Sequence, residues 1–225
     1  MFNVRFPTSL NEARKFQQIV SQQISLKDEF GDINYITGLD ISYKNKRAYG
    51  AAIVYDCKNK KVIEKKRVEM LPKFEYVSGF LFMREVPIFL KLVDQLVNQS
   101  DLFLVDGHGI AHPAYAGSAT VFGYFIKKPV IGVAKAPMNV FEFGSEEKRE
   151  DFLITNLYVG KRLVGKKIAY KDKNWKPIYV SPGNNISISS SLDVVINLLD
   201  SKHKLPKPLL LAHLAANEYK ENIYH

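Results

Sequence analysis

The pattern of apolar and polar residues in the first part of the chain predicts one helix followed by three strands. The segment Ser9-Leu10-Asn11-Glu12 has the form of a capping box and opens an amphipathic helix through about Ser25. β-Branched and aromatic residues then predict strands near 34–43, 47–56 and 61–70. The separators between these strands are short and polar, as in hairpin turns, so we expect an antiparallel meander.

From about residue 80 the pattern changes to an alternation of helices and strands. The predicted order is a helix near 80–98, a strand ending at Asp106, a helix near 117–126 and a strand at 129–134. This alternation is typical of parallel βαβ pairing. Two short late strands flanking a turn at 171–177, and then two helices, are expected to follow.

Together these elements predict an α/β fold with a mixed sheet, in which an antiparallel meander precedes parallel βαβ strands and helices cover both faces. The chain has 225 residues, of which 46% are hydrophobic, and no Gly/Ser-rich linker divides it. We therefore expect a single domain over residues 1–225. The segment 138–166, with the charged run Glu146–Asp151, is expected to be a solvated excursion.

The apolar strand 102–105 stops at a carboxylate, Asp106, and glycine-rich backbone follows at once. The carboxyl ends of strands in open α/β sheets are where ligands bind, so a functional acid is predicted here. The alternative is that Asp106 only caps the turn that follows it, as is common for Asp-Gly.

Two further acids stand in apolar surroundings. Asp40 lies within the first predicted strand, and Glu85 lies near the start of the helix predicted at 80–98. A carboxylate in an apolar strand needs a cation, a hydrogen-bond cage or a metal, because desolvation is costly. Glu85 alone is explained equally well as a first-turn acid favoured by the helix dipole.

Three carboxylates without a cysteine cluster describe a hard, oxygen-rich site. Such a site suits Mg²⁺, with Mn²⁺ as a substitute, and favours phosphodiester chemistry. The competing interpretation is zinc, because His108 and His112 are spaced i, i+4. Pro113 follows directly, however, and no Glu stands where a zinc-protease helix requires one.

The formal charge of +9 fits a polyanionic partner such as DNA or RNA. Acids and bases are interspersed, so a lysine-rich surface explains the same charge. The single cysteine, Cys57, excludes an intrachain disulfide and suits a reducing compartment. No segment has the length of a membrane span, and we expect a cytoplasmic, monomeric protein that does not bind membranes.

Six segments resemble the endonuclease V family in order and spacing, and together they span nearly the whole chain. They are Gly38–Tyr43, Tyr76–Glu85, Asp106–Pro113, Ile131–Pro137, Tyr179–Gly183 and Leu211–Asn217. The resemblance implies an RNase H-like fold and a repair nuclease that recognises deaminated purine, chiefly deoxyinosine. Such an enzyme nicks the same strand at the second phosphodiester bond on the 3′ side, leaving 3′-hydroxyl and 5′-phosphate ends.

The resemblance also places the family's metal-binding and catalytic acids on Asp40, Glu85 and Asp106, which are the acids selected above on physical grounds. It identifies His213 as the catalytic histidine, which can orient the attacking water or contact the phosphate. Lys135 is similar to the family's site lysine and can pair with a phosphate oxygen. From the residues alone, His213 reads as a half-buried helical histidine and Lys135 as a solvated strand-end lysine.

The family's DNA wedge maps to Tyr76, Val77, Ser78 and Gly79, and the lesion-binding segment continues through Phe80 and Leu81. Tyr76 is the aromatic residue expected to insert at the lesion while the altered base turns out of the helix. Prolines usually flank this tip in the family, whereas this chain has Glu75 and Ser78. This departure should loosen the loop and place an acid near DNA phosphates.

Glycines 107, 109 and 117 are expected to allow close backbone approach to a flipped hypoxanthine, and His112 is expected to help hold the loop around the base. For Gly117, the alternative that it serves only as a turn residue stays open.

Two alternatives to a deoxyinosine endonuclease stay open. One is an inosine-specific endoribonuclease, because the family includes members that accept RNA and the active-site residues do not separate the two substrates. The other is a non-catalytic nucleic-acid-binding protein of the same fold. Its expected mark is a missing carboxylate, and Asp40, Glu85 and Asp106 are all present.

Overall fold

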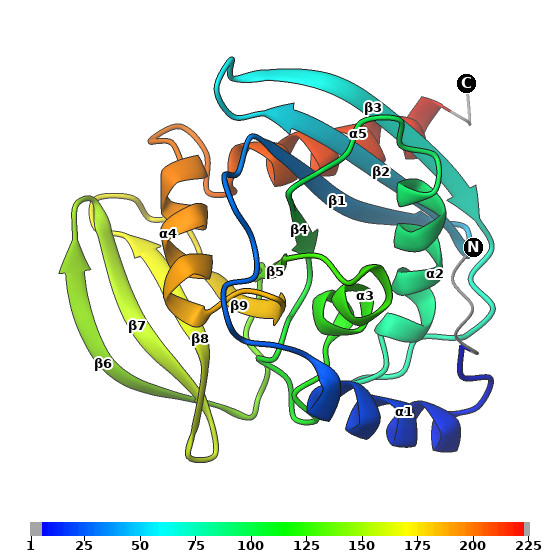
Figure 1. The fold of residues 1–225 in the computed structure, drawn as a ribbon, viewed down its shortest axis with the longest axis horizontal. Coiled ribbons are helices and arrows are strands. Elements are labelled where there is room, and N and C mark those ends of the chain that lie inside the picture. Colours follow the sequence, from blue (N-terminus) through cyan, green and yellow to red (C-terminus); the bar gives the residue numbers. More distant parts are fainter. Residues whose placement is uncertain (1–5, 223–225) are drawn as a thin grey trace.

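The computed structural model describes residues 6–222, which form a nine-stranded mixed sheet with helices packed on it (Figure 1). The elements are α1 (Leu10–Gln23), β1 (Tyr35–Lys44), β2 (Arg47–Asp56), β3 (Lys61–Met70), α2 (Phe82–Val93), β4 (Leu102–Asp106), α3 (Ser118–Ile126), β5 (Val130–Ala134), β6 (Phe141–Arg149), β7 (Phe152–Val159), β8 (Arg162–Tyr170), β9 (Ile178–Asn184), α4 (Ile188–Leu198) and α5 (Lys207–Asn222). Across the described part of the chain, no helix combines the length and apolar character needed to cross a bilayer.

The strand order is β3-β2-β1-β4-β5-β9-β8-β7-β6. Strands β1, β2 and β3 pair antiparallel, as the predicted meander requires. Strand β4 pairs parallel with β1 on one side and with β5 on the other, so the predicted βαβ section is confirmed. Strand β9 pairs antiparallel with β5, so the pairing changes from parallel back to antiparallel at this point in the sheet.

Helices cover both faces of the sheet, as predicted, because successive residues of the central strands point to opposite sides. Leu39 and Val105 join a core with α1, α2 and α3. Ile36 and Leu104 face the other way and pack with α4 and the start of α5. Figure 1 shows the two layers, with α2 and α3 on one side of the central strands and α5 behind them.

The two predicted helices of the first half are present but shorter than expected. Ser9 caps α1 by accepting a hydrogen bond from the Glu12 backbone N–H at 3.2 Å, and the Glu12 carboxylate accepts from Thr8, so the capping box closes one residue earlier. Helix α2 ends at Val93 rather than near 98. The Glu64 carboxylate of β3 binds the backbone N–H groups of residues 97 and 98, which ties the chain after α2 to the sheet.

The prediction that 138–166 is a solvated excursion is wrong. These residues form β6, β7 and the first part of β8, which extend the same sheet beyond β9. Leu157 and Val164 are fully buried against Ile110 and Ala134. The charged run lies on β6, which is the exposed sheet edge, and on its turn into β7, so edge polarity hid the alternating apolar pattern that follows.

Helix α5 lies against β1 because β1 has a glycine at the contact. A Cβ on Gly38 would stand 2.3 Å from the backbone oxygen of Pro208, at the first turn of α5. No side chain fits this gap without moving the helix. The close contact therefore sets the height of α5 above β1, on which Asp40 follows two residues later.

We expect Gly38→Ala to lower the free energy of unfolding by about 1–3 kcal/mol, because the added methyl group overpacks the β1–α5 contact. Denaturant unfolding measures this change. Gly31→Ala is the matched control, since no atom lies within 4 Å of its added Cβ, and it should change stability by less than about 0.5 kcal/mol. Equal stability of the two variants would contradict the packing argument.

Candidate active site

Parallel strand pairing brings the two strand-borne acids together. Leu39 of β1 lies opposite Val105 of β4, so Asp40 and Asp106 come next on neighbouring strands. Asp106 is in turn opposite Val133 of β5, and Lys135 follows just beyond that strand. Three residues far apart in the sequence thus meet at the same end of these central strands.

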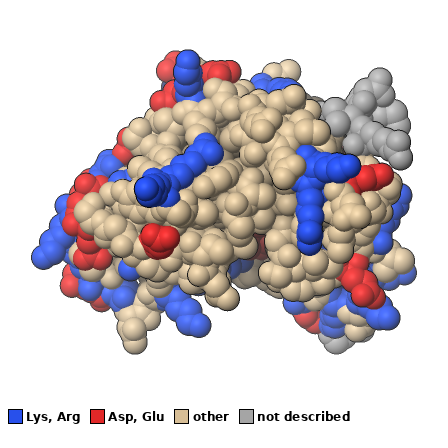
Figure 2. Space-filling model, turned by 90° about the horizontal axis from the view of Figure 1, so that it is seen from below, with Lys and Arg blue, Asp and Glu red and all other residues tan. Residues whose placement is uncertain are grey.

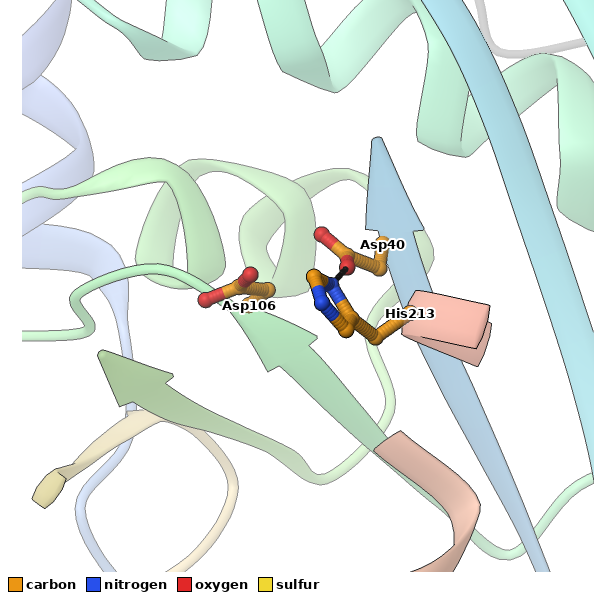
Figure 3. A group of neighbouring side chains, drawn as sticks. All are labelled: Asp40, Asp106 and His213. Atoms are coloured by element: carbon orange, nitrogen blue, oxygen red, sulfur yellow. Dashed lines mark hydrogen bonds and ion pairs between the residues drawn. The ribbon is translucent and has the colours of Figure 1, made fainter. Parts of the chain in front are cut away.

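Figure 3 shows the His213 ring of α5 directed at Asp40 of β1, with Asp106 of β4 beside them. One potential ligand atom from each of the three lies within 4.8 Å of the others. His213 Nδ1 is 2.6 Å from Asp40 Oδ2. Lys135 Nζ donates to Asp106 Oδ2 and lies 3.6 Å from Asp40 Oδ2, so its ammonium group stands between the two carboxylates.

The His213 ring is held from both sides. A nitrogen this close to a carboxylate oxygen must donate, so the ring carries a proton on Nδ1 toward Asp40. Asn217 Nδ2 lies 3.2 Å from His213 Nε2, and Asn217 Oδ1 accepts from Ser42 at 2.8 Å, which fixes how the amide is oriented. Sequence analysis assigned Asn217 no role, although its i, i+4 spacing from His213 on a helix was a usable signal.

Glu85 stands apart from this group. It is buried at the start of α2, near Gly107, and its Oε2 atom has no hydrogen-bond partner within residues 6–222. Burial raises the pKa of Glu85 to about 8; Ser118 opposes the shift by hydrogen bonding, while the charges of Asp106 and Asp40 add to it. The structure therefore places all three predicted acids around one region but joins only two of them directly.

The two strand-borne acids have opposite electrostatic situations. Burial alone would raise the pKa of Asp40, but the His213 hydrogen bond and the Lys135 charge outweigh it, and the pKa is lowered. The pKa of Asp106 is raised, first by burial and then by the negative charge of Asp40, against the opposing charge of Lys135. Asp40 is the carboxylate held in the ionised form.

These residues fit a hard divalent cation. Carboxylate oxygens are ligands suited to Mg²⁺ or Mn²⁺. The position between Asp40 and Asp106 already accepts a positive group, the Lys135 ammonium. The unpartnered oxygen of Glu85 lacks a donor or cation that its burial calls for.

A cavity of about 800 Å³ opens beside the acids. Its lining includes most of the predicted wedge and lesion-binding residues: Tyr76, Ser78, Gly79, Phe80, Leu81, Gly107, His112 and Gly117. The predicted residues Val77 and Gly109 are outside the lining. Residues 136–140 form part of another wall, which sequence analysis did not assign.

The exposure, backbone conformation or packing of individual residues in and next to this lining explains why each residue type stands at its position. Tyr76 is 65% exposed at the loop tip. Gly79 has φ +82°, a left-handed conformation that favours glycine. A Cβ on Gly117 would lie 2.3 Å from the His108 oxygen, so this glycine is required by packing within the loop; outside the lining, a Cβ on Gly109 would lie 2.2 Å from the Pro182 oxygen of β9, so that glycine is required by packing of the loop on β9.

His112 links two walls of the cavity as a neutral ring. Its Nδ1 accepts from the Ala114 N–H at 3.1 Å, and the ring also bonds to the Gly79 backbone. Burial lowers the pKa of His112 to about 4. Both ring nitrogens are thus engaged with backbone, which does not suit the zinc interpretation of the i, i+4 pair with His108.

Gln17 is a cavity-wall residue that sequence analysis missed. Its side chain is buried, and Nε2 donates to the backbone oxygens of Gly79 at 3.1 Å and Ala116 at 2.8 Å. The carboxamide therefore joins α1, the wedge loop and the loop before α3. A polar residue on the apolar face of the predicted helix was the only signal in the sequence.

The surface around α1 shows no single basic patch. In Figure 2, which views the molecule from below, uncharged residues cover most of the face, and basic and acidic side chains are interspersed mainly at its margins. The formal charge of +9 is therefore not gathered on this face.

Comparisons with known proteins show which family and which solved structures the chain is similar to. The model of the family described as Endonuclease V matches residues 18–214. Endonuclease V of Dictyoglomus thermophilum is 34% identical over 203 residues, covering 90% of this chain and 87% of that protein. The solved structure of Endonuclease V from Bacillus subtilis superposes with a TM-score of 0.85 at 28% identity, covering 100% of this chain and 96% of that one.

A third similar protein was solved with nucleic acid. Ciona intestinalis Endonuclease V, in complex with a 24mer DNA containing an inosine followed by a ribo-adenosine, has a TM-score of 0.82 at 21% identity, covering 95% of this chain and 98% of that one. These structures share the mixed sheet with its helical layers, so the predicted RNase H-like fold is confirmed.

We expect Gln17→Leu to lower the free energy of unfolding by about 1–3 kcal/mol, because it leaves two carbonyl groups without their buried donor at nearly constant volume. Thermal or denaturant unfolding measures the loss. Gln22→Leu, on an exposed position of the same helix, is the control and should change stability by less than about 0.5 kcal/mol. A Gln17 variant as stable as the control would contradict this role.

The raised pKa of Glu85 predicts a pH dependence of stability for the metal-free protein. Below its ordinary pKa of 4.5 the group is protonated in both states; between that value and about 8 only the unfolded state ionises, so stability falls as pH rises. In EDTA, we expect Glu85→Gln to reduce this fall across that range. Unfolding temperatures measured against pH test this, with the exposed Glu75→Gln as control. Parallel curves for both variants would be evidence against the assignment.

Proposed function

The chain belongs to the endonuclease V family of nucleases, and we propose that it is a deoxyinosine 3′ endonuclease that hydrolyses the second phosphodiester bond 3′ to the lesion. The observation that carries the proposal is the convergence of Asp40, Asp106, His213 and Lys135 beside the 800 Å³ cavity. The Ciona intestinalis protein, which has the same fold, binds DNA containing an inosine. The products would be 3′-hydroxyl and 5′-phosphate ends.

The proposed cofactor is Mg²⁺, with Mn²⁺ as a substitute, held by Asp40, Asp106 and Glu85. A bound divalent ion supplies positive charge for the phosphodiester in its transition state and acidifies water. The carboxylates then keep their ionised forms, since a nearby cation lowers the pKa values that burial raises.

Lys135 and His213 act on the phosphate and on water. Lys135 Nζ lies among the acids. Once a divalent ion balances the charge of the carboxylates, this ammonium group needs to move only a short way to pair with a phosphate oxygen. His213 is oriented by Asp40 and Asn217 and is partly exposed, so its ring can orient the attacking water.

The cavity beside the acids accommodates the flipped base. Gly107 connects Asp106 to the cavity wall, so a base held there places its own strand at the carboxylates. Tyr76 at the exposed loop tip takes the stacking position that the base leaves. We also propose that the chain acts as one domain and as a monomer.

The second candidate is an inosine-specific endoribonuclease. The observation that favours it is the ribo-adenosine after the inosine in the oligonucleotide bound by the Ciona intestinalis protein. The cut proposed here lies just beyond that 3′ neighbour, so the sugar at this position can influence the rate.

Cleavage of end-labelled strands tests both candidates. We expect a Mg²⁺-dependent nick directly after the 3′ neighbour of a single deoxyinosine, abolished by EDTA. Asp106→Asn should slow it at least about 100-fold, because it removes a carboxylate from the proposed ion site. The ratio of rates on matched deoxyribose and ribose strands decides between DNA and RNA. Near-normal turnover by Asp106→Asn would overturn the assignment of this acid.

Tyr76→Ala tests the wedge. We expect it to reduce the preference for inosine-containing over normal duplex DNA by about 10-fold, because one aromatic stacking partner is lost. Competition cleavage measures the preference, and the control is a single-stranded substrate, on which no helix must be opened. Equal losses on both substrates would argue against a wedge.

A further inference from the structure

A second cavity, of about 410 Å³, lies on the other side of the acids. It is formed between the turn from β8 to β9 and the connection from α4 to α5, which is drawn in orange in Figure 1. Its lining comprises Lys135, Trp175, Lys202, His203, Lys204, Leu205, Leu210 and His213.

The two cavities are neighbours without overlapping. They share no lining residue, yet Ala136 lines the first and Lys135 lines the second. Gly107, which follows Asp106, lines the first, and His213, which contacts Asp40, lines the second. The carboxylates therefore lie between the two cavities.

The chemistry of the second cavity suits a nucleotide. Its lining contains three lysines and no carboxylate, together with one tryptophan. Within residues 6–222, neither Lys202 nor Lys204 pairs with a carboxylate, so both charges are available to an anion. A positive surface with an aromatic ring is the combination that binds single-stranded nucleic acid.

The walls of this cavity are built by specific bonds. Tyr170 Oη donates to the backbone oxygens of Asp200 at 2.6 Å and His203 at 3.0 Å, which ties the α4–α5 connection to the end of β8. The Tyr170 ring also packs edge-on against Trp175, with centroids 4.9 Å apart. The Asp200 carboxylate is used within its own loop, accepting from the backbone N–H groups of Lys202 and His203 at 2.8 Å.

We propose that this second cavity binds the nucleotide on the 3′ side of the cleaved bond, with Trp175 stacking on its base and Lys202 and Lys204 pairing with the next phosphate. The assignment rests on the proposed function for its polarity. If the inosine base occupies the first cavity and the cut lies 3′ to it at the carboxylates, the strand continues in the 3′ direction into the second cavity.

Intrinsic fluorescence tests the stacking directly, because Trp175 is the only tryptophan in the chain. The probe is a single-stranded pentathymidylate with a 5′-phosphate, which represents the 3′-side product, and the control probe has an abasic first residue. With Mg²⁺ present, we expect the first probe to quench the fluorescence and to bind about 10-fold more tightly, as one lost stacking contact requires. Equal affinity and quenching for both probes, or binding without quenching, would overturn the proposal.

Variants provide the matched control, with Kd measured by anisotropy of labelled probes. We expect Trp175→Ala to bind both probes equally and Trp175→Phe to keep most of the preference. Lys176→Ala, at an exposed neighbour outside the lining, should leave the preference unchanged. In the double variant Lys202→Ala/Lys204→Ala, the slope of log Kd against log salt concentration should fall by about one to two. A preference that survives in Trp175→Ala would overturn the assignment.

The binding tests and the nicking assay fail independently. Base-dependent quenching without a nick at deoxyinosine supports the nucleotide site and overturns the proposed activity. A correct nick with fluorescence that ignores the first base overturns the nucleotide site and leaves the activity.

Discussion

The parallel pairing of β4 with β1 and β5 is the constraint on which the site depends. It brings Asp40, Asp106 and Lys135 to the same end of the central strands, although they are separated by up to 95 positions, from 40 to 135. Two carboxylates brought this close repel each other and are costly to bury. Lys135 and His213 offset that cost, and the unpartnered oxygen of Glu85 shows that the region still has room for positive charge. The repulsion between these buried carboxylates, which is unfavourable in the metal-free protein, also favours the binding of a divalent cation.

The helices and the loops bonded to them complete the site around the strand-borne acids. Helix α5 approaches β1 closely because Gly38 has no side chain, and this contact carries His213 to Asp40. Gln17 and His112 both bond to the backbone at Gly79, so the loop that carries Tyr76 is anchored at its base while its tip stays exposed. The bonds at Gly79 fix only the base of the loop, and the residues at its tip, with Glu75 and Ser78 in place of prolines, lie beyond this anchor.

The extension of the sheet by β6, β7 and β8 has a role in this arrangement. Through β8 it supplies Tyr170, which holds the α4–α5 connection and supports Trp175. Under the proposed function, the end of β8, just past the segment expected to be a solvated excursion, supports the surface that receives the strand after the cut. Lesion recognition and strand positioning are then assigned to separate cavities on either side of the acids.

Local pattern in the sequence determined the fold class, the meander, the βαβ section and the two strand-borne acids, because periodicity and a charge within or at the end of an apolar strand are local signals. The family resemblance added His213 and Lys135, whose types alone are ambiguous. The length of the sheet, the roles of Gln17 and Asn217, and the separation of Glu85 from the other acids were decided by the tertiary structure. The reason is physical: Gln17 acts on Ala116 and Ser42 on Asn217, and bonds between residues so distant in sequence leave no periodic trace in either segment.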